Sequence, residues 1–494
     1  MTHILGLSAG FHDAAISLID KHGNIEFAGH SERYSKIKND PNVHPALVAE
    51  LYGYDISTVA YYERPLIKQL RQLYSGQGLE WDKISTRKIV QQQLKPKLLH
   101  GVKIKNYNHH LCHAAAGFQT SSFDRATVVV IDAVGEFETV TIWGAEYDRQ
   151  GQATYKKLWQ QNYPHSIGLF YSAVTGRVGL KPLDEEYILM GMAAYGQTDC
   201  RRVMKMDLVE DDWEIRFKEN LHTGLDANYL SDYQDFDIAA GAQALVENLI
   251  TNVMRRAALF GWSNNLVYMG GVALNCSANR QLGDWFENIW IMPCPSDGGS
   301  SLGAAALAFG HRINWHNAYL GHDIPGAYPV MDILDELLTK QIVGVASGRA
   351  EFGPRALGNR SLLADPRSSE IKEKVNAIKR RQQFRPFAPV VLAEVADQYF
   401  DMPHGWHHSP YMQSVARCRQ PGLTPAVCHH DGTSRVQTVA QDGSGIRALL
   451  EAWYKETGCP MLLNTSLNIR GEPMVNDRQD ADRFESLYGV KVCS

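Results

Sequence analysis

Two strand–turn–strand units restrict the fold of this chain more than any other feature of its sequence. The first, residues 4–19, reads ILGLSAGFHDAAISLI, and the second, residues 128–144, reads VVVIDAVGEFETVTIWG. In each unit, two apolar runs that favour strands flank a turn containing glycine and an acidic residue. Small turn residues let backbone amides face a ligand, and such turns hold phosphate oxygens. The repeat predicts a domain built from two halves, each of which begins with such a hairpin.

Paired turns of this kind are similar to those of the actin-like ATPase fold, where they hold nucleotide phosphates. This resemblance makes Gly135, in the second turn, a candidate nucleotide contact. A further strand at residues 266–269 runs into Gly270 and Gly271, followed by Asn275. In a nucleotide-binding half-domain, backbone approaches an adenosine at such a place, so these three residues are further candidates.

The stretch NHHLCHAAA, residues 108–116, predicts a helix that carries two histidines on one face. Alanine is the strongest helix former, and residues four apart, such as His109 and His113, are neighbours on a helix surface. Asp132 ends a buried strand, and Asp297 opens a glycine-rich loop into an alanine-rich helix, where an N-cap role is the alternative. Two imidazoles and two carboxylates suit Fe(II), Mn(II) or Zn(II), and spacing does not choose among them.

The tip of the first hairpin carries two residues that a simple turn does not need. His12 and Asp13 follow the glycine there. Their alternative interpretation is turn formation by Asp13 and a surface position for His12. We retain both as candidate catalytic residues.

Length and composition predict a cytoplasmic protein of two or three domains. The 494 residues exceed one ordinary core, and the net charge of −5 excludes a global basic field that recruits nucleic acid. Eight scattered cysteines fit reduced thiols rather than a disulfide framework. We see neither a signal peptide nor an apolar run long enough to cross a membrane. A polar segment around residues 311–328 predicts a boundary between domains 1–330 and 331–494.

The second predicted domain collects basic and amide side chains beside glycine and proline. The guanidinium fork binds oxyanions in a bidentate manner, so the pattern predicts a site for a small phosphorylated anion. The side chains considered for this site are Arg355, Arg360, Lys379, Arg385, Arg435, Asn464 and Asn468. A histidine and cysteine group between His404 and His430 matches no structural zinc spacing, and we predict no second metal site there.

Ordered motifs along nearly the whole chain resemble the O-carbamoyltransferases of antibiotic and nodulation-factor biosynthesis, the NodU/CmcH family. The motifs include GLSAGFHDAAISLI, SERYSKIKND, YYERP, HHLCHA, VVVIDAVGE, GGVALNC, DGGSSLGAA, EFGPRALGNRSLLADPR, FRPFAP, HDGTSRVQTV and NTSLNIRGEP. The resemblance implies an α/β chain: an actin-like (ASKHA) duplicated ATPase-type domain followed by a YrdC-like α/β domain.

The same resemblance implies a two-step reaction. The C-terminal domain converts carbamoyl phosphate and ATP, used with Mg(II), to carbamoyl adenylate. The N-terminal domain then transfers the carbamoyl group to a substrate hydroxyl with the help of a divalent metal, for which Fe(II) is favoured. Residue by residue, the metal ligands are His109, His113, Asp132 and Asp297. The ATP and carbamoyl phosphate contacts are Arg355, Lys379, Arg385, Arg435 and Asn464, with Lys38 from the N-terminal domain. His12 is the implied group at the transfer site.

Three positions depart from the family pattern. Ile188 stands where a lysine is usual, which removes a charge near the expected acceptor pocket. Gln382 replaces a glutamate before FRPFAP, and Ala133 replaces a glycine after Asp132. The change at Ile188 concerns the acceptor more than the reaction, Gln382 is expected to be tolerated, and Ala133 is expected to stiffen its turn slightly.

The acceptor is expected to be a small hydroxylated metabolite or a nucleotide. Carbamoylation of a hydroxymethylated base in DNA is an alternative that the basic stretch from Lys83 to Lys105 permits, although the overall acidity argues against it. A non-enzymatic actin-like ATP-binding regulator is the competing class, but it has no use for a second anion site. Threonylcarbamoyl transfer to tRNA would favour a more basic surface.

Overall fold

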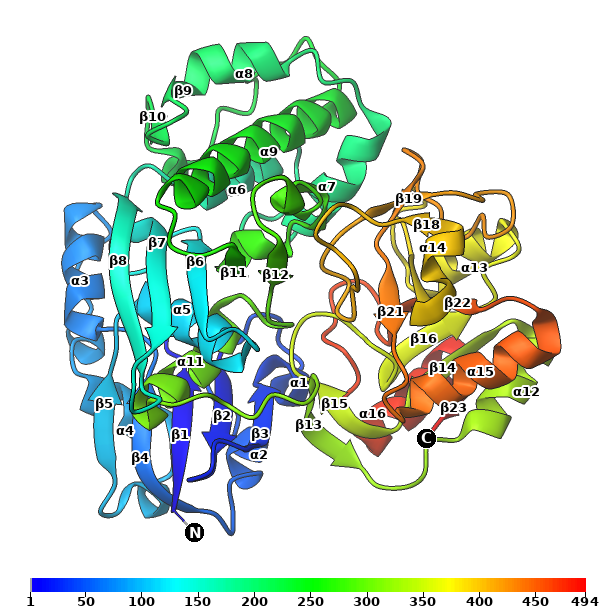
Figure 1. Cartoon of the computed structure of the whole chain (residues 1–494), viewed down its shortest axis with the longest axis horizontal. Helices are drawn as coiled ribbons and strands as arrows, with labels where there is room; N and C mark the ends of the chain where they lie inside the picture. The colour runs from blue at the N-terminus through cyan, green and yellow to red at the C-terminus, as the bar shows by residue number, and fades with distance from the viewer. Residues whose placement is uncertain (1) are drawn as a thin grey trace. The chain divides into compact units, whose positions relative to one another are not determined.

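The computed structural model describes residues 2–494, which form two compact units (Figure 1). The first unit holds the residues up to Ser35, Asn39–Asn275 and Leu282–Asn317, and the second holds Lys36–Lys38, Cys276–Gln281 and Ala318–Ser494. The functional division at residue 330 stays a prediction. By contacts, the chain from Ala318 onward packs with the second unit because β13 (Tyr319–Ile324) pairs with β15 (Gly348–Glu351).

Both predicted hairpins are confirmed, and each opens a five-stranded sheet. The first sheet has the order β3-β2-β1-β4-β5, with β1 antiparallel to β2 and parallel to β4. The second has the order β8-β7-β6-β11-β12, with β6 antiparallel to β7 and parallel to β11. The strands are β1 (Thr2–Ser8), β2 (Ala15–Ile19), β3 (Ile25–His30), β4 (Asp55–Tyr61), β5 (Lys103–Asn106), β6 (Arg125–Ile131), β7 (Glu138–Tyr147), β8 (Ala153–Asn162), β11 (Asn265–Met269) and β12 (Asn288–Trp290). This repeated order confirms the duplicated actin-like α/β fold.

Two helices cross between the halves of the first unit. Helix α5 (His109–Thr120) follows the last strand of the first sheet but packs on β6 and β11 of the second. Helix α11 (Asp297–Phe309) follows the last strand of the second sheet but packs on β1, β2 and β4 of the first. The helices also pack on each other, so closely that a Cβ on Gly303 would lie 1.8 Å from the carbonyl oxygen of Cys112. The crossing brings the first turns of both helices together.

Further helices belong to the first unit. They are α1 (Glu32–Ser35), α2 (Pro45–Ala49), α3 (Pro65–Tyr74), α4 (Thr86–Gln93), α6 (Ile167–Arg177), α7 (Glu186–Met192), α8 (Arg201–Leu208) and the long α9 (Asp235–Leu259), with a small ribbon of β9 (Val209–Asp211) and β10 (Arg216–Phe217). Helices α6, α7 and α8 all pack against α9 (Figure 1). None of the helices described in residues 2–494 combines the length and apolarity that a membrane span requires.

The second unit has a six-stranded mixed sheet in the order β21-β17-β22-β16-β14-β23. Apolar side chains alternate along its strands: Leu462 packs with α12 and α15, whereas Met461 and Leu463 pack with α13 and α16. Helices therefore cover both faces of the sheet, as in an α/β layer. The strands are β14 (Ile342–Ala346), β16 (Arg360–Ala364), β17 (Ala388–Leu392), β21 (Gln437–Val439), β22 (Met461–Ser466) and β23 (Val492–Cys493), beside a three-stranded sheet of β18 (Phe400–Asp401), β19 (Ala416–Cys418) and β20 (Thr433–Ser434). The helices are α10 (Cys276–Asn279), α12 (Val330–Lys340), α13 (Glu370–Ile378), α14 (Ala396–Tyr399), α15 (Gly445–Thr457) and α16 (Arg478–Tyr488).

Candidate metal centre

Helix α5 presents His109 and His113 together because its start is fixed. The Asn108 side chain caps the helix by accepting a hydrogen bond from the backbone N–H of Leu111 at 2.9 Å. The two imidazoles are one turn apart, buried, and their Nε2 atoms are 3.1 Å from each other. The helix predicted for residues 108–116 is confirmed in its position and in the face that it presents.

Two carboxylates complete the cluster from elements far away in the sequence. Asp132 follows β6, and its Oδ2 lies 3.2 Å from His109 Nε2 and 3.6 Å from His113 Nε2. Asp297 begins α11, and its Oδ1 lies 3.4 Å from His109 Nε2 and 3.2 Å from His113 Nε2. The Asp297 side chain makes no N-cap hydrogen bond, because the N-cap position of α11 belongs to Ser296. The alternative N-cap role for Asp297 is therefore not observed.

The spacing of these four atoms fits one divalent ion. Ligands about 2.1 Å from an ion are about 3.4 Å apart at tetrahedral corners and about 3.0 Å apart at adjacent octahedral corners. The five distances above lie between 3.1 and 3.6 Å. No second group of three or more such ligands occurs in the described chain, residues 2–494.

The charges around the cluster leave room for a cation. Nearby Glu63 is paired with Lys68, and Glu136 is paired with Arg64. The ion-pair partners of Asp132 and Asp297 in the described residues are histidines. Two carboxylates without a lysine or arginine match the charge of one divalent ion.

The electrostatics of the cluster favour ionised carboxylates. Burial raises the pKa of Asp297, but His109 and His12 outweigh it and hold that pKa well below its usual value. Burial and the nearby Asp297 raise the pKa of Asp132, but hydrogen bonds from His109 and His113 lower it overall. Both carboxylates are consequently charged at neutral pH.

Outer contacts orient two of the four ligands, His113 and Asp132. His113 Nδ1 lies 3.0 Å from the carbonyl oxygen of Pro295, which leaves its Nε2 for a metal. Asp132 Oδ1 accepts a hydrogen bond of 3.2 Å from the backbone N–H of Gly271. Gly270 precedes it with φ +92°, and a Cβ there would meet the carbonyl oxygen of Ile131 at 2.1 Å. The diglycine thus serves the Asp132 ligand directly in this structure.

Other candidates from the first unit lie at or near this cluster. His12 Nε2 is 3.5 Å from Asp297 Oδ2, and its Nδ1 is 3.3 Å from Asp13 Oδ2. The His12 side chain is 54% exposed, so it forms the open edge of the cluster. Local desolvation lowers the pKa of His12, but Asp297 and Asp13 raise it to about 9. A Cβ on Gly135 would lie 2.8 Å from the ring of His109.

Two further predictions concern residues away from the metal cluster. Asn275 and Gln243 exchange amide hydrogen bonds of 3.0 and 3.1 Å. Ile188, where the family usually has lysine, is only 1% exposed within α7. Its side chain therefore packs in the core, and the expectation that this position lies near an acceptor pocket stays a prediction.

The anion-site candidates belong to the second unit. Asn464 on β22 donates hydrogen bonds to Gln437 Oε1 (2.8 Å) and to the carbonyl oxygen of Ala356, next to Arg355 (3.1 Å). The ammonium group of the buried Lys379 donates to Ser466, two residues further along β22, and to Asn468. Burial, together with Arg381 and Arg385, lowers the pKa of Lys379 well below its usual value. One end of β22 therefore gathers Asn464, Lys379 and the loop of Arg355.

Two of the candidate residues for the anion site each carry a buried polar atom that has no hydrogen-bond partner within the described protein. Arg435 Nε and Asn464 Oδ1 are buried without a hydrogen bond, which marks a donor and an acceptor for a ligand. Lys38 packs with this unit as part of the segment Lys36–Lys38. Arg360 does not fit the site, because it is fully buried and donates to five backbone carbonyl oxygens.

Two buried glutamates beside the start of α5, Glu63 and Glu136, were not among the predicted site residues. Glu136 accepts hydrogen bonds from the backbone N–H of Arg64 at 2.8 Å, from Asn108 Nδ2 at 3.2 Å and from the backbone N–H of His109 at 3.3 Å. Glu63 is fully buried beside His109. Their signal was present in the motifs YYERP and VVVIDAVGE, where an acidic residue follows a buried strand.

Comparison with known proteins gives matches along most of the chain. Two protein-family models match, Carbamoyltransferase N-terminus over residues 56–306 and Carbamoyltransferase C-terminus over residues 334–492. The nodulation protein NolNO of Sinorhizobium fredii is 30% identical over 95% of this chain and 76% of its own. The 3'-hydroxymethylcephem-O-carbamoyltransferase of Amycolatopsis lactamdurans is 28% identical over 97% of this chain and 95% of its own.

One more sequence relative and one solved structure are also similar to this chain. An uncharacterized protein of Synechocystis sp. is 31% identical over 98% of this chain and 94% of its own. The crystal structure of HypF in its phosphate- and nucleotide-bound form is 14% identical, with a TM-score of 0.35 over 62% of this chain and 55% of that chain.

Proposed function

Because the chain belongs to the carbamoyltransferase family, whose N-terminal and C-terminal models it matches, we propose that it is an ATP- and metal-dependent O-carbamoyltransferase that uses carbamoyl phosphate. The single observation that carries the metal-dependent step is the buried cluster of His109, His113, Asp132 and Asp297, whose spacing suits one divalent ion. The family match makes the chain a transferase and disfavours a non-enzymatic regulator.

The first step is assigned to the second unit. Water hydrolyses carbamoyl phosphate to carbamate and inorganic phosphate. The carbamate oxygen then attacks the α-phosphate of ATP, supplied with Mg(II). Carbamoyl adenylate forms and pyrophosphate leaves. Arginine and lysine neutralise the phosphate oxygens during this step. The residues proposed for these contacts are Arg355, Lys379, Arg385, Arg435 and Asn464, with Lys38 from the segment that packs with this unit.

The second step is assigned to the first unit. A divalent ion at the cluster, for which we favour Fe(II) over Mn(II) or Zn(II), supplies Lewis-acid polarisation of the carbamoyl carbonyl oxygen. The acceptor hydroxyl oxygen attacks the carbamoyl carbon of the adenylate, and AMP leaves. His12 at the open edge orients this hydroxyl and is the proposed acceptor of its proton, and Asp13 holds the His12 ring through Nδ1. Gly135, Gly270, Gly271 and Asn275 remain proposed nucleotide contacts of this unit. Holding both steps in one chain protects an adenylate that water would hydrolyse.

The acceptor is proposed to be a hydroxyl group of a small metabolite or a nucleotide. The name of the Amycolatopsis relative specifies a hydroxymethyl group on a cephem as its substrate. By analogy, we expect a primary hydroxyl on a compact molecule as the acceptor here.

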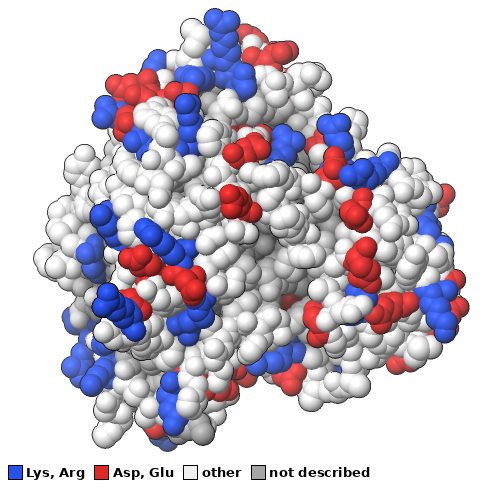
Figure 2. Space-filling view, viewed as in Figure 1, with Lys and Arg blue, Asp and Glu red and all other residues white. Residues whose placement is uncertain are grey.

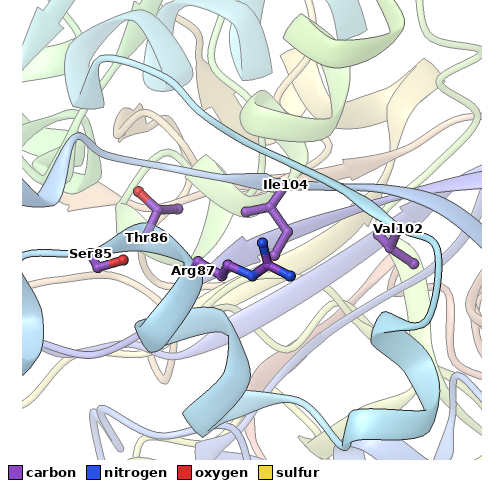
Figure 3. A pocket seen from close by; sticks show the side chains of 5 residues that line it. All are labelled: Ser85, Thr86, Arg87, Val102 and Ile104. Carbon is purple, nitrogen blue, oxygen red and sulfur yellow. The ribbon is translucent and has the colours of Figure 1, made fainter.

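A hydroxymethylated base in DNA is the second candidate acceptor. The exposed cations that favour it lie between Lys83 and Lys105. Within that stretch, Arg87 lines a surface pocket with Ser85, Thr86, Val102 and Ile104 (Figure 3). On the face drawn in Figure 2, however, Lys and Arg alternate with Asp and Glu. Turnover on a free nucleoside that does not change with salt would exclude this candidate, whereas salt-dependent DNA binding would support it.

The test of the proposed function separates the two steps. The protein is incubated with ATP, Mg(II) and carbamoyl phosphate, and inorganic phosphate and pyrophosphate are measured together. We expect both to be released, and no release would contradict the enzyme proposal. Asp297→Ala should abolish carbamoyl transfer to an acceptor while largely sparing pyrophosphate release, because Asp297 belongs to the metal cluster of the first unit.

A further inference from the structure

Helix α3 has its polar face buried and its apolar face exposed. Lys68, Gln69 and Arg71 are at most 7% exposed, whereas Leu66, Leu70 and Leu73 are about half exposed, at 52%, 47% and 56%. Burying a lysine side chain costs free energy unless its ammonium group is paired and hydrogen-bonded. This orientation of α3 therefore requires a specific partner for Lys68.

That partner is Glu63, which precedes the helix. Lys68 Nζ lies 2.9 and 3.1 Å from the two carboxylate oxygens of Glu63, and the Glu63 side chain is fully buried. Lys68 Nζ also lies 3.2 Å from the centroid of the Phe11 ring, next to His12. The Lys68 end of the pair therefore contacts Phe11 in the turn of His12, and the Glu63 end lies beside His109 of α5.

Glu63 faces the one ring nitrogen of the two ligand histidines that has no hydrogen bond, His109 Nδ1. His109 Nε2 points at the other three ligands, so a bound metal requires the proton of the neutral ring to be on Nδ1. His109 Nδ1 is buried with no hydrogen-bond partner, and Glu63 Oε2 is 3.7 Å away. A buried donor without a partner costs about 1–3 kcal/mol. A small approach of the two side chains removes that cost.

We propose that Glu63 is a positioning residue for the metal centre, which holds His109 through its Nδ1–H while Lys68 holds Glu63 in place. The two histidine ligands would then differ in their outer partner, a carboxylate for His109 and the Pro295 carbonyl for His113. A carboxylate behind a ligating imidazole fixes the ring and makes it a stronger donor. The inference rests on the divalent ion of the proposed function.

The experiment measures metal binding in the full-length protein with Co(II) as the probe. Co(II) affinity is determined by competition with a chelator, and the exchangeable imidazole N–H signals of the loaded protein are recorded by paramagnetic NMR after ¹⁵N-histidine labelling. We expect one such signal from each ligand histidine. Glu63→Gln should weaken Co(II) binding by about 10–100-fold and should shift or broaden the His109 signal while the His113 signal stays in place.

Two further variants separate positioning from net charge and from general destabilisation. Glu63→Gln combined with Lys68→Met leaves the net charge unchanged but still lacks the carboxylate, so it should bind Co(II) as weakly as Glu63→Gln. Asp365→Asn is the matched control, because Asp365 is another buried carboxylate paired with a cation, Arg367, at 2.7 Å, and it belongs to the second unit. It should bind Co(II) as the wild type does.

The outcomes distinguish this inference from the proposed function. A wild-type protein that binds no Co(II) would contradict the metal site itself. Wild-type binding with an unchanged affinity and an unmoved His109 signal in Glu63→Gln would overturn the positioning role alone. Recovery of affinity in the double variant would also overturn it, because the effect would then be one of net charge.

Discussion

At the scale of single residues, the metal cluster depends on a glycine as well as on its ligands. Gly135 has no side chain, and a Cβ there would lie 2.8 Å from the rings of both His109 and His110. Real Cβ contacts are longer, so the histidine rings must move if the methyl group is added.

Gly135→Ala is therefore expected to weaken Co(II) binding at least tenfold and to cost about 1–3 kcal/mol of unfolding free energy. Chelator competition and urea denaturation measure the two effects. Gly422→Ala is the control, since nothing lies within 4 Å of a Cβ at that position. Normal Co(II) affinity in Gly135→Ala would show that the glycine is not needed by the histidine rings.

Cys428 provides a pH-dependent prediction at the same scale. A hydrogen bond from Cys418 lowers the pKa of Cys428 to about 7, and Lys372 contributes in the same direction. The thiolate is the reactive form and is populated above that pH. We expect one cysteine to react with iodoacetamide much faster than the others, with a rate that rises as pH increases and reaches half its maximum near pH 7.

The control for this prediction is Cys428→Ser, which should remove the fast phase. The other thiol of the pair should stay slow, since the hydrogen bond with Cys428 and burial raise the pKa of Cys418. A fast phase that persists in Cys428→Ser would assign the reactivity to another cysteine.

At the scale of elements, the crossing of α5 and α11 brings the ligands together. Two ligands lie on α5 and one at the first residue of α11, and Gly303 allows the helices to touch. A Cβ on Gly303 would meet the carbonyl oxygen of Cys112 at 1.8 Å, and backbone cannot move aside as a flexible side chain does.

Gly303→Ala is accordingly expected to destabilise the protein by about 1–3 kcal/mol or more and to weaken Co(II) binding by separating Asp297 from the histidines. The free energy of unfolding and the Co(II) affinity are measured on the same sample. A stable variant with unchanged affinity would show that the crossing tolerates a wider spacing.

At the scale of the whole molecule, a substitution in the anion site of the second unit is expected to leave metal binding in the first unit unchanged. Arg435 Nε in the second unit is a buried donor without a partner, and we assign it to an anionic substrate. Arg435→Gln should raise the KM for carbamoyl phosphate at least tenfold, as expected when a charged hydrogen bond worth about 1.5–3 kcal/mol is lost, and should leave Co(II) affinity unchanged.

Steady-state pyrophosphate release measures this effect. Arg419→Gln is the matched control, because Arg419 is an exposed arginine paired with the exposed Asp401 in the same unit. An unaltered KM in Arg435→Gln would remove Arg435 from the anion site. A change in Co(II) affinity would show that the two sites are not independent.

The sequence by itself determined the features that local periodicity encodes. The two hairpins, the helix that starts at His109 and the strand that ends before Asp132 were all predicted, since short apolar runs beside turn residues and an alanine-rich run favour these local structures. The position of Asp297 at the start of a helix was also readable, although its choice between capping and metal binding was not.

Only the tertiary structure decided which polar residues are buried and which partners they find. The leucines of α3 are about half exposed, whereas Lys68 of the same helix is buried in an ion pair with Glu63. Likewise, Ile188 lies in the core, and Arg360 binds backbone carbonyls instead of an anion. Such outcomes depend on the balance between desolvation and partners brought by the fold, and a linear pattern does not contain those partners. The same contacts leave His109 Nδ1 facing Glu63 in the folded chain.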